Sequence, residues 1–349
     1  MSGSPAYGGP HGKMPAALAG FRPSAARAAG LDRVVRSSFA SSIAAVLRPF
    51  AAQGATDEAT IARVAAAVRD GSAGPGVFVA YASLVDAVFA DDGGGAAAAL
   101  TALVAAPCPA ITAITAPRWL TLDDHDLGPG QAARYLALFD DDPGSPVRCR
   151  AASAGDLARV AALGEAAMAA LAAADASLAA EIATFAREVV IVDGTGGADG
   201  FLFHGVSSFH AWGALLLNGT ALTSRLDMIQ TLAHETGHTL LHGLTLGAST
   251  VDNPPGERLP SPLREGARPL DGIVHAAYVS ARMELCLRSL LAADVLSPDE
   301  RATAVDASAG HRRNWSDALA TIDAHARFTP AGAAAFAPAR AWMAETAGG

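Results

Sequence analysis

The sequence predicts a mostly helical α+β fold, with a helical N-terminal half and a small antiparallel sheet in the second half. Across most of the first 187 residues, apolar side chains recur three and four positions apart, which is typical of amphipathic helices. Three short runs rich in branched and aromatic residues follow at 188–193, 200–206 and 212–218, and glycine-rich turns separate them. Helical periodicity returns after residue 218.

The elements of the first half follow from this periodicity. The segment GTGGADG (194–200) joins the first two strands, and we expect it to form a hairpin turn. The helices that precede the strands are expected at 31–50, 57–70, 81–89, 96–105, 130–139 and, as one long helix, 151–187.

Capping residues mark the helices of the second half. Ser224 and Asp227 form a capping-box pattern, which predicts a helix that starts there and ends at Gly243. Asp271 is expected to cap a helix over 272–291. Two further helix starts are predicted where a capping residue precedes a proline, at Ser297-Pro298 and Thr329-Pro330.

Composition narrows the classes of function. The 349 residues are 51% hydrophobic, which is enough for a large core, and the net charge of −9 offers no basic surface for nucleic acid. Charged residues or glycine interrupt the apolar runs, so we expect no transmembrane helix. Three scattered cysteines and the absence of a secretory signal indicate a cytoplasmic protein.

The chain divides into three regions by composition. Lys13 is the only lysine, against 24 arginines elsewhere, which predicts that residues 1–13 are a vector-derived leader. Residues 14–187 form the helical N-terminal region, and residues 188–349 form a metal-binding catalytic region. We expect the last two regions to make one compact unit.

The most specific signal is the segment His234-Glu235-Thr236-Gly237-His238, an H-E-x-x-H pattern within a predicted helix. Residues four apart share one face of a helix, so both imidazoles can bind a single divalent metal ion. Glu235 borders the same face and can reach a metal-bound water. With the sheet packed on this helix, the pattern predicts a zincin-like core. His242 lies about 12 Å along the helix from His234, too far to share the metal easily.

The third metal ligand has two candidates on the helix over 272–291. His275 and Glu284 are nine positions apart, about 180° around a helix, so only one can face the metal. Glu284 would complete two histidines and a carboxylate, the set of a zinc peptidase in which Glu235 is the general base. His275 would instead give three imidazoles and bring Tyr278 and Arg282 to the metal-facing side, with Tyr278 as a candidate for co-substrate binding.

The segment SPLREGARPLDGIVHAAYVSARMELCLRSL (261–290), together with HETGHTLLH (234–242) and FTPAG (328–332), resembles the HExxH-motif proteins encoded beside ribosomal peptide precursors. The resemblance spans about residues 185 to 340. It implies an iron- and 2-oxoglutarate-dependent dioxygenase that hydroxylates a side-chain β-carbon of a ribosomally synthesised precursor peptide.

The resemblance also implies roles for individual residues. His234, His238 and His275 would bind Fe(II), and Arg264 and Arg268 would hold the 2-oxoglutarate carboxylate. Glu235 would then position a water molecule or a ligand. One departure is Leu263, where the family pattern has tryptophan, so the resemblance does not say which residue forms the wall of the co-substrate pocket.

Three functional hypotheses follow from the sequence. The first is the Fe(II)- and 2-oxoglutarate-dependent peptide hydroxylase, whose three facial ligands leave coordination positions for co-substrate and dioxygen. The second is a zinc metallopeptidase with Glu284 as the third ligand. The third is a peptide-binding protein with a structural metal ion held by four protein ligands.

Overall fold

The computed structural model describes residues 14–105, 116–139, 148–194, 203–261 and 266–346. The chain is mostly helical with a small sheet, as expected for an α+β protein of this kind. It forms two compact units that alternate along the sequence. The first contains Ala29–Ala161 and Ala183–Leu222, and the second contains Met14–Ala28, Ala162–Ile182 and Thr223–Gly349.

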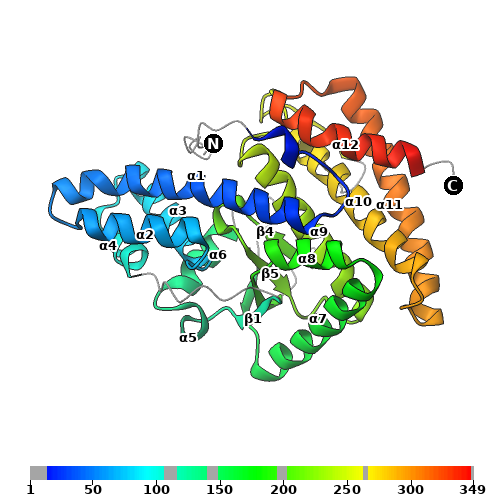
Figure 1. The fold of residues 1–349 in the computed structure, drawn as a ribbon, viewed down its shortest axis with the longest axis horizontal. Helices are drawn as coiled ribbons and strands as arrows, with labels where there is room; N and C mark the ends of the chain where they lie inside the picture. Colours follow the sequence, from blue (N-terminus) through cyan, green and yellow to red (C-terminus); the bar gives the residue numbers. More distant parts are fainter. Residues whose placement is uncertain (1–13, 106–115, 140–147, 195–202, 262–265, 347–349) are drawn as a thin grey trace. The chain divides into compact units, whose positions relative to one another are not determined.

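The first unit combines helices with a five-stranded sheet (Figure 1). Its strands are β1 (Arg118–Thr121), β2 (Cys149–Ala151), β3 (Glu188–Gly194), β4 (Gly205–Ser207) and β5 (Ala214–Asn218). Its helices are most of α1 (Ala25–Ala52), then α2 (Glu58–Asp70), α3 (Gly76–Phe89), α4 (Gly93–Val104), α5 (Asp124–Leu127) and α6 (Gln131–Phe139), with the short η2 (Phe209–Ala211).

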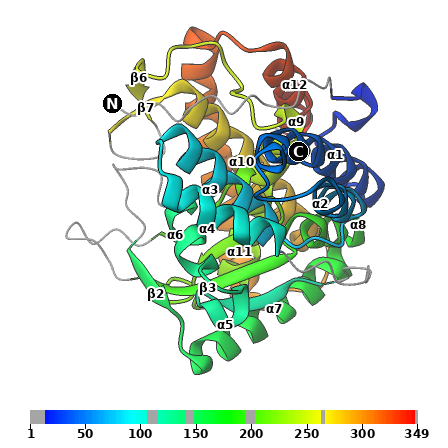
Figure 2. The same ribbon diagram turned by 90° about the vertical axis from the view of Figure 1, so that its left-hand side faces the viewer.

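The sheet is mixed, so the expectation of an antiparallel sheet is wrong. The strand order is β1-β3-β5-β4, with β1 and β5 parallel to β3 and β4 antiparallel to β5. β2 is antiparallel to the end of β3, and Figure 2 shows these two strands beside each other. Every residue of β5 and all but the last residue of β3 are buried. Such continuous apolar strands are typical of parallel pairs covered on both faces, and alternation would have marked an antiparallel pair.

Two further expectations for this unit are wrong. The first and second predicted strands do not form a hairpin, because β4 pairs with β5 and not with β3. Most of the proposed turn, residues 195–200, lies outside the described residues. The first half is also not purely helical, since β1 and β2 belong to it. Both are short strands between helical segments, so periodicity gave little sign of them.

A hydrophobic core lies against one face of the sheet. Side chains two apart on β3 and β5 point to the same face and pack with α3 and α6. The buried members of this cluster are Val79, Leu122, Tyr135, Phe139, Val190, Val192, Ala211, Ala214 and Leu216.

The long helix expected over 151–187 is two helices, α7 (Ala154–Ala174) and α8 (Ala176–Phe185). Asp175 separates them, and its carboxylate accepts a hydrogen bond from the backbone N–H of Leu178 at 3.0 Å. An aspartate that caps a new helix in this way competes with continuing the old one.

By length and mean hydropathy (1.5) α7 could cross a membrane, contrary to the expectation that no segment qualifies, although one such helix is weak evidence.

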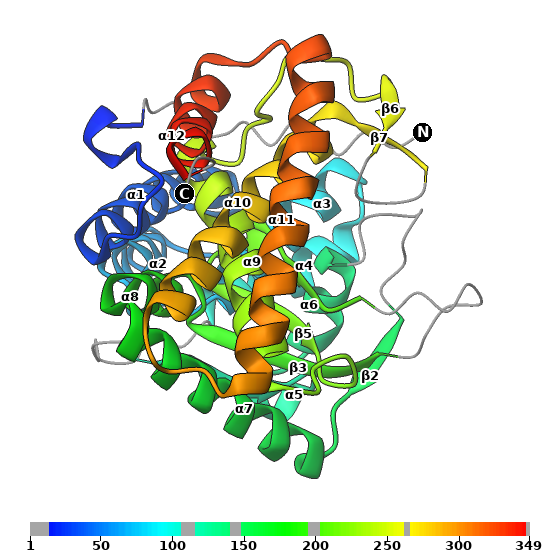
Figure 3. The same cartoon turned by 90° about the vertical axis from the view of Figure 1, so that its right-hand side faces the viewer.

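The second unit contains the H-E-x-x-H helix. Its elements after Leu222 are α9 (Arg225–Thr245), β6 (Arg258–Pro260), β7 (Ala267–Pro269), α10 (Leu270–Ala292), α11 (Pro298–His325) and α12 (Pro330–Thr346), and the short η1 (Ala16–Leu18) precedes them in the chain. Helix α10 packs against both α9 and α11, and Figure 3 shows the three helices side by side.

The predicted helix starts in this unit are confirmed at three of four places. Ser224 and Ser297 each form a capping box, and Thr329 Oγ1 accepts a hydrogen bond from the N–H of Gly332 at 3.0 Å at the start of α12. Asp271 does not cap α10, which begins one residue earlier, at Leu270. Its carboxylate bonds to Thr250 instead.

Candidate metal centre

One face of α9 carries the two histidines of the H-E-x-x-H motif. The Nε2 atoms of His234 and His238 lie 3.2 Å apart, and their ring centroids lie 4.8 Å apart. Both side chains are partly exposed, whereas Glu235, Thr236 and Gly237 between them are buried. The imidazoles therefore lie on the accessible face of a helix whose other faces form part of the core.

His275 reaches the same place from α10. Its Nδ1 lies 3.2 Å from Nδ1 of His238, and the two rings are nearly parallel, with centroids 5.5 Å apart. The ring of His242 lies 4.9 Å from that of His275, so His242 extends the row at its far end. The structure thus brings together the three histidines expected to bind a metal ion, from two helices.

The contacts show what metal binding by all three would require. His238 directs Nε2 to His234 and Nδ1 to His275, and one ion can take only one of these nitrogens. With the ion at Nε2 of His238, the His275 ring must turn about its side-chain torsions toward that nitrogen. The adjustment concerns a partly exposed side chain, and the helix backbones already approach closely enough for the rings to touch.

The protonation state of His275 suits a ligand. Burial lowers the pKa of its imidazole below the ordinary value, and the nearby carboxylate of Asp271 only partly opposes this effect. At neutral pH the ring is therefore uncharged and keeps a nitrogen lone pair. A metal ion requires a neutral imidazole.

Glu235 lies beside the histidines and has almost no exposure (3%). Its Oε1 is 3.9 Å from Nε2 of His234, the nitrogen that faces His238. At this position the carboxylate can accept a proton from a water molecule at the site or position that water. The position fits either role considered from the sequence.

Glu284 is turned away from the imidazoles into a different contact. Its Oε1 accepts a hydrogen bond from Nε of Arg312 at 2.7 Å, and its Oε2 accepts one from the Ser308 hydroxyl at 2.6 Å. Both partners belong to α11, and the Glu284 side chain is fully buried (0%). The prediction that His275 and Glu284 lie on opposite faces of α10 is confirmed. The geometry favours His275 as the residue that joins His234 and His238.

Arg282 was expected on the metal-facing side of α10, but it does not face the histidines. It donates hydrogen bonds to the backbone oxygen of Phe21 at 2.6 Å and to the carboxylate of Glu181. Tyr278 belongs to the same buried cluster, with its ring edge against Phe21 at 5.7 Å between centroids. Desolvation raises the pKa of the Tyr278 hydroxyl, which is consistent with a neutral phenol in the core. Its role in co-substrate binding stays a prediction.

The two arginines proposed for the co-substrate are described only in part. Arg264 lies outside the described residues, as does Leu263. Arg268 lies in β7 opposite Leu259 of β6 and is partly exposed. Its proposed role in binding a carboxylate stays a prediction as well.

Sequence reasoning missed the close approach of α9 and α10. A Cβ atom placed on Gly237 would lie 3.3 Å from side-chain carbons of both Val279 and Arg282. The glycine within the motif therefore allows the two helices to pack at the distance that brings His275 to His238. The signal available in the sequence was a glycine inside a predicted helix, where it is otherwise unfavourable.

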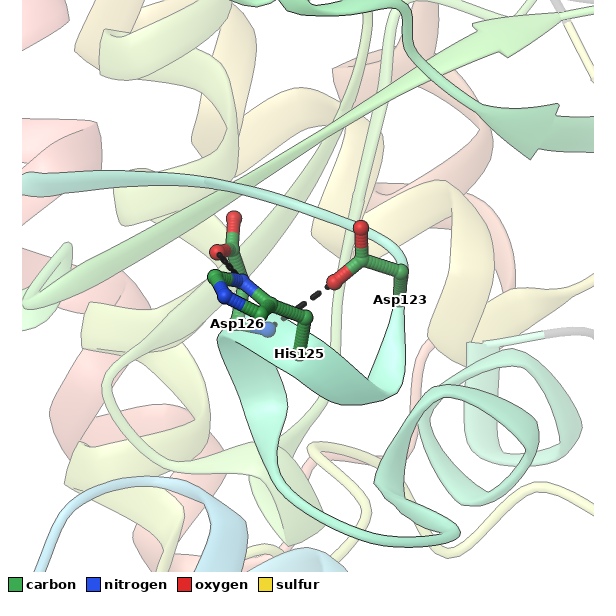
Figure 4. A group of neighbouring side chains, drawn as sticks. All are labelled: Asp123, His125 and Asp126. Carbon is green, nitrogen blue, oxygen red and sulfur yellow. Dashed lines mark hydrogen bonds and ion pairs between the residues drawn. The ribbon is translucent and has the colours of Figure 1, made fainter.

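A second group of possible metal ligands lies in the first unit, at Asp123, His125 and Asp126 (Figure 4). Its carboxylates already serve the local turn. Asp123 accepts a hydrogen bond from the N–H of Asp126, and Asp126 accepts one from the N–H of Thr121, both at 2.9 Å. These contacts account for the acidic residues as parts of a turn, and we assign no metal ion to them.

No protein-family model matches the chain, and no curated protein matches it closely enough to indicate a family. The site is therefore interpreted from its own geometry.

Proposed function

We propose that the protein is an Fe(II)- and 2-oxoglutarate-dependent dioxygenase that hydroxylates a side-chain β-carbon of a ribosomally synthesised precursor peptide. The observation that carries the proposal is the 3.2 Å contact between His275 and His238, beside the equally short contact between His238 and His234. A cytoplasmic location and a zincin-like core around α9 are parts of the same proposal.

The donor set supports a non-heme iron site. His234, His238 and His275 would offer three neutral nitrogens, and a set of three protein ligands would leave coordination positions of the ion for other groups. Fe(II), when bound there with 2-oxoglutarate, would supply the activation of dioxygen, and the overall reaction would convert C–H, O₂ and 2-oxoglutarate to C–OH, succinate and CO₂.

The residues of the chain would divide the remaining tasks. Glu235 would position a water molecule at the site or accept a proton from it, because its Oε1 lies 3.9 Å from Nε2 of His234, the nitrogen that would bind the ion. Arg268, and Arg264 by the family resemblance, would bind the distal carboxylate of 2-oxoglutarate through the planar guanidinium.

The position of Glu284 argues against the proposed peptidase ligand set. A zinc peptidase that used Glu284 would have to break the bonds of its carboxylate to Arg312 and Ser308. It would also have to turn a fully buried side chain to the opposite face of α10.

The test is turnover of the peptide encoded beside the gene. Protein loaded with Fe(II) without oxygen, then given 2-oxoglutarate, the precursor peptide and air, should yield a product heavier by one oxygen atom and an equal amount of succinate. The variant His275→Ala should lose both products, and Glu284→Gln should retain them. Cleavage of the peptide by the zinc-loaded protein, without hydroxylation by the iron-loaded protein, would contradict the proposal.

A further inference from the structure

The FTPAG segment (328–332) makes its polar contacts with the loop that follows α9. The N–H of Thr329 donates to the backbone oxygen of Thr250 at 3.0 Å, and its hydroxyl lies 3.2 Å from the same oxygen. Phe328 forms an isolated antiparallel bridge with Val251. The start of α12 is thereby fixed to residues 250–251.

Gly332 makes this attachment possible. A Cβ atom on Gly332 would lie 1.9 Å from the backbone oxygen of Thr250, a separation that no side chain can occupy. The obstacle is backbone, so it cannot turn aside as a side chain can. The glycine of FTPAG is therefore required for α12 to sit on Thr250.

Thr250 in turn holds the first turn of α10. It is fully buried, and both its N–H and its hydroxyl donate to Oδ1 of Asp271, at 2.8 Å and 2.5 Å. The residue before α10 is Pro269, and it offers no side-chain cap. The start of α10 therefore has no side-chain cap from Pro269, and the contact between Asp271 and Thr250 attaches it to the loop after α9.

His275 lies one helical turn after Asp271, about 6 Å further along α10. A continuous series of contacts therefore leads from FTPAG through Thr250 and Asp271 to the helical turn that carries His275. The position of that turn determines whether the imidazole reaches His238.

We propose that Thr250 and Asp271, held by the FTPAG segment, are positioning residues for the metal site, because they fix the turn of α10 that presents His275. The inference rests on the proposed metal site, but it does not depend on the reaction that the metal ion supports.

The test compares the zinc affinity of the wild type with that of four variants of the full chain, measured by competition with a chromophoric chelator. Asp271→Ala should bind Zn²⁺ about 10-fold more weakly than the wild type, near the lower end of the loss typical of residues that orient metal ligands. Asp271→Asn should stay within about threefold, because its amide oxygen can still accept both bonds from Thr250.

The matched control is Asp299→Ala. Asp299 is an exposed aspartate in the first turn of the neighbouring helix α11, so its removal costs the same interaction with the helix dipole. It should leave zinc affinity unchanged. Thr250→Val provides a second, milder test, since it removes only the hydroxyl donor and should weaken zinc binding by a smaller factor than Asp271→Ala.

The outcomes distinguish the proposed positioning role of Thr250 and Asp271 from the proposed metal site. Wild-type affinity in both Asp271→Ala and Thr250→Val would overturn the positioning role, and so would an equal loss in Asp271→Asn and Asp271→Ala. If Asp271→Ala does not fold, unchanged affinity in Thr250→Val alone overturns it. Failure of the wild-type protein to bind Zn²⁺ would contradict the proposed metal site itself.

Discussion

Replacing the buried Glu284 with glutamine tests whether this carboxylate is structural or a metal ligand. In the structure it accepts hydrogen bonds from Arg312 and Ser308 of α11, and a second guanidinium, that of Arg288, lies 4.0 Å away. Glutamine has nearly the same shape and keeps an oxygen acceptor, but it removes the charge. We expect a loss of stability and no change in metal affinity.

The magnitude follows from which partner is left without its counter-charge. Breaking a buried ion pair costs about 3–5 kcal/mol when the remaining charge stays buried. In Glu284→Gln the remaining charge is Arg312, whose side chain is 30% exposed and can be hydrated, so we expect about 1–3 kcal/mol. In Arg312→Met the fully buried Glu284 keeps only the more distant guanidinium of Arg288, at 4.0 Å, so we expect about 3 kcal/mol, the lower end of that range.

Two measurements on the same samples check this prediction. Urea denaturation gives the free energy of unfolding, and titration with Zn²⁺ gives the metal affinity. The reasoning predicts that Arg312→Met is the more destabilised variant and that both variants bind zinc as the wild type does. A 10-fold or greater loss of affinity in Glu284→Gln, with stability unchanged, would refute it and identify Glu284 as a ligand.

Three further predictions concern packing and charge. Gly237→Ala should destabilise by about 1–2 kcal/mol and weaken zinc binding, because overpacking against Arg282 outweighs the helix preference of alanine. Glu300→Gln should lower the unfolding free energy at pH 7 by about 1 kcal/mol, because the hydrogen bond from Arg225 lowers the pKa of Glu300 from 4.5 to about 2 but solvent screens this pair near the surface. Asp32→Ala should cost about 3–5 kcal/mol in urea denaturation, because it leaves two guanidiniums in the first unit without their shared carboxylate.

Each of these predictions has its own control or contrary result. Gly272→Ala adds a methyl group where no described atom outside its own stretch of helix lies within 4 Å, so equal losses of zinc affinity in it and Gly237→Ala would contradict the packing argument. The Glu300 contribution is present above the unfolded pKa near 4.5 and is lost as pH falls toward 2, so the variant and the wild type should converge there. A stability gap that does not narrow on acidification would contradict it. For Asp32, an unfolding midpoint equal to that of the wild type would show that the guanidiniums need no counter-charge.

Local patterns predicted most of the helices. Periodicity located them, and two starts were marked to the residue, by the capping-box pattern at Ser224 and by the capping residue before a proline at Ser297. The strand pairing could not be predicted, because it depends on which segments meet across long stretches of chain. β1 pairs with β3, about 70 residues later, and nothing local indicates this parallel partner.

The candidate site shows the same division between local and distant information. The spacing of His234 and His238 predicted that they share a face, and nine-residue spacing predicted that His275 and Glu284 do not. Spacing alone could not choose between those two, because the choice depends on how α10 is rotated against α9 and α11. The rotation of α10 depends on contacts with residues far away in the sequence, such as those of Arg282 with Glu181 and of Glu284 with Arg312.

The central claim is that three imidazoles, from His234, His238 and His275, bind one metal ion. Extended X-ray absorption fine structure of the zinc-loaded protein tests it most directly, because it counts the imidazoles bound to the ion. The account predicts three imidazoles in the wild-type protein and two in His275→Ala. An equal number in both proteins would contradict it.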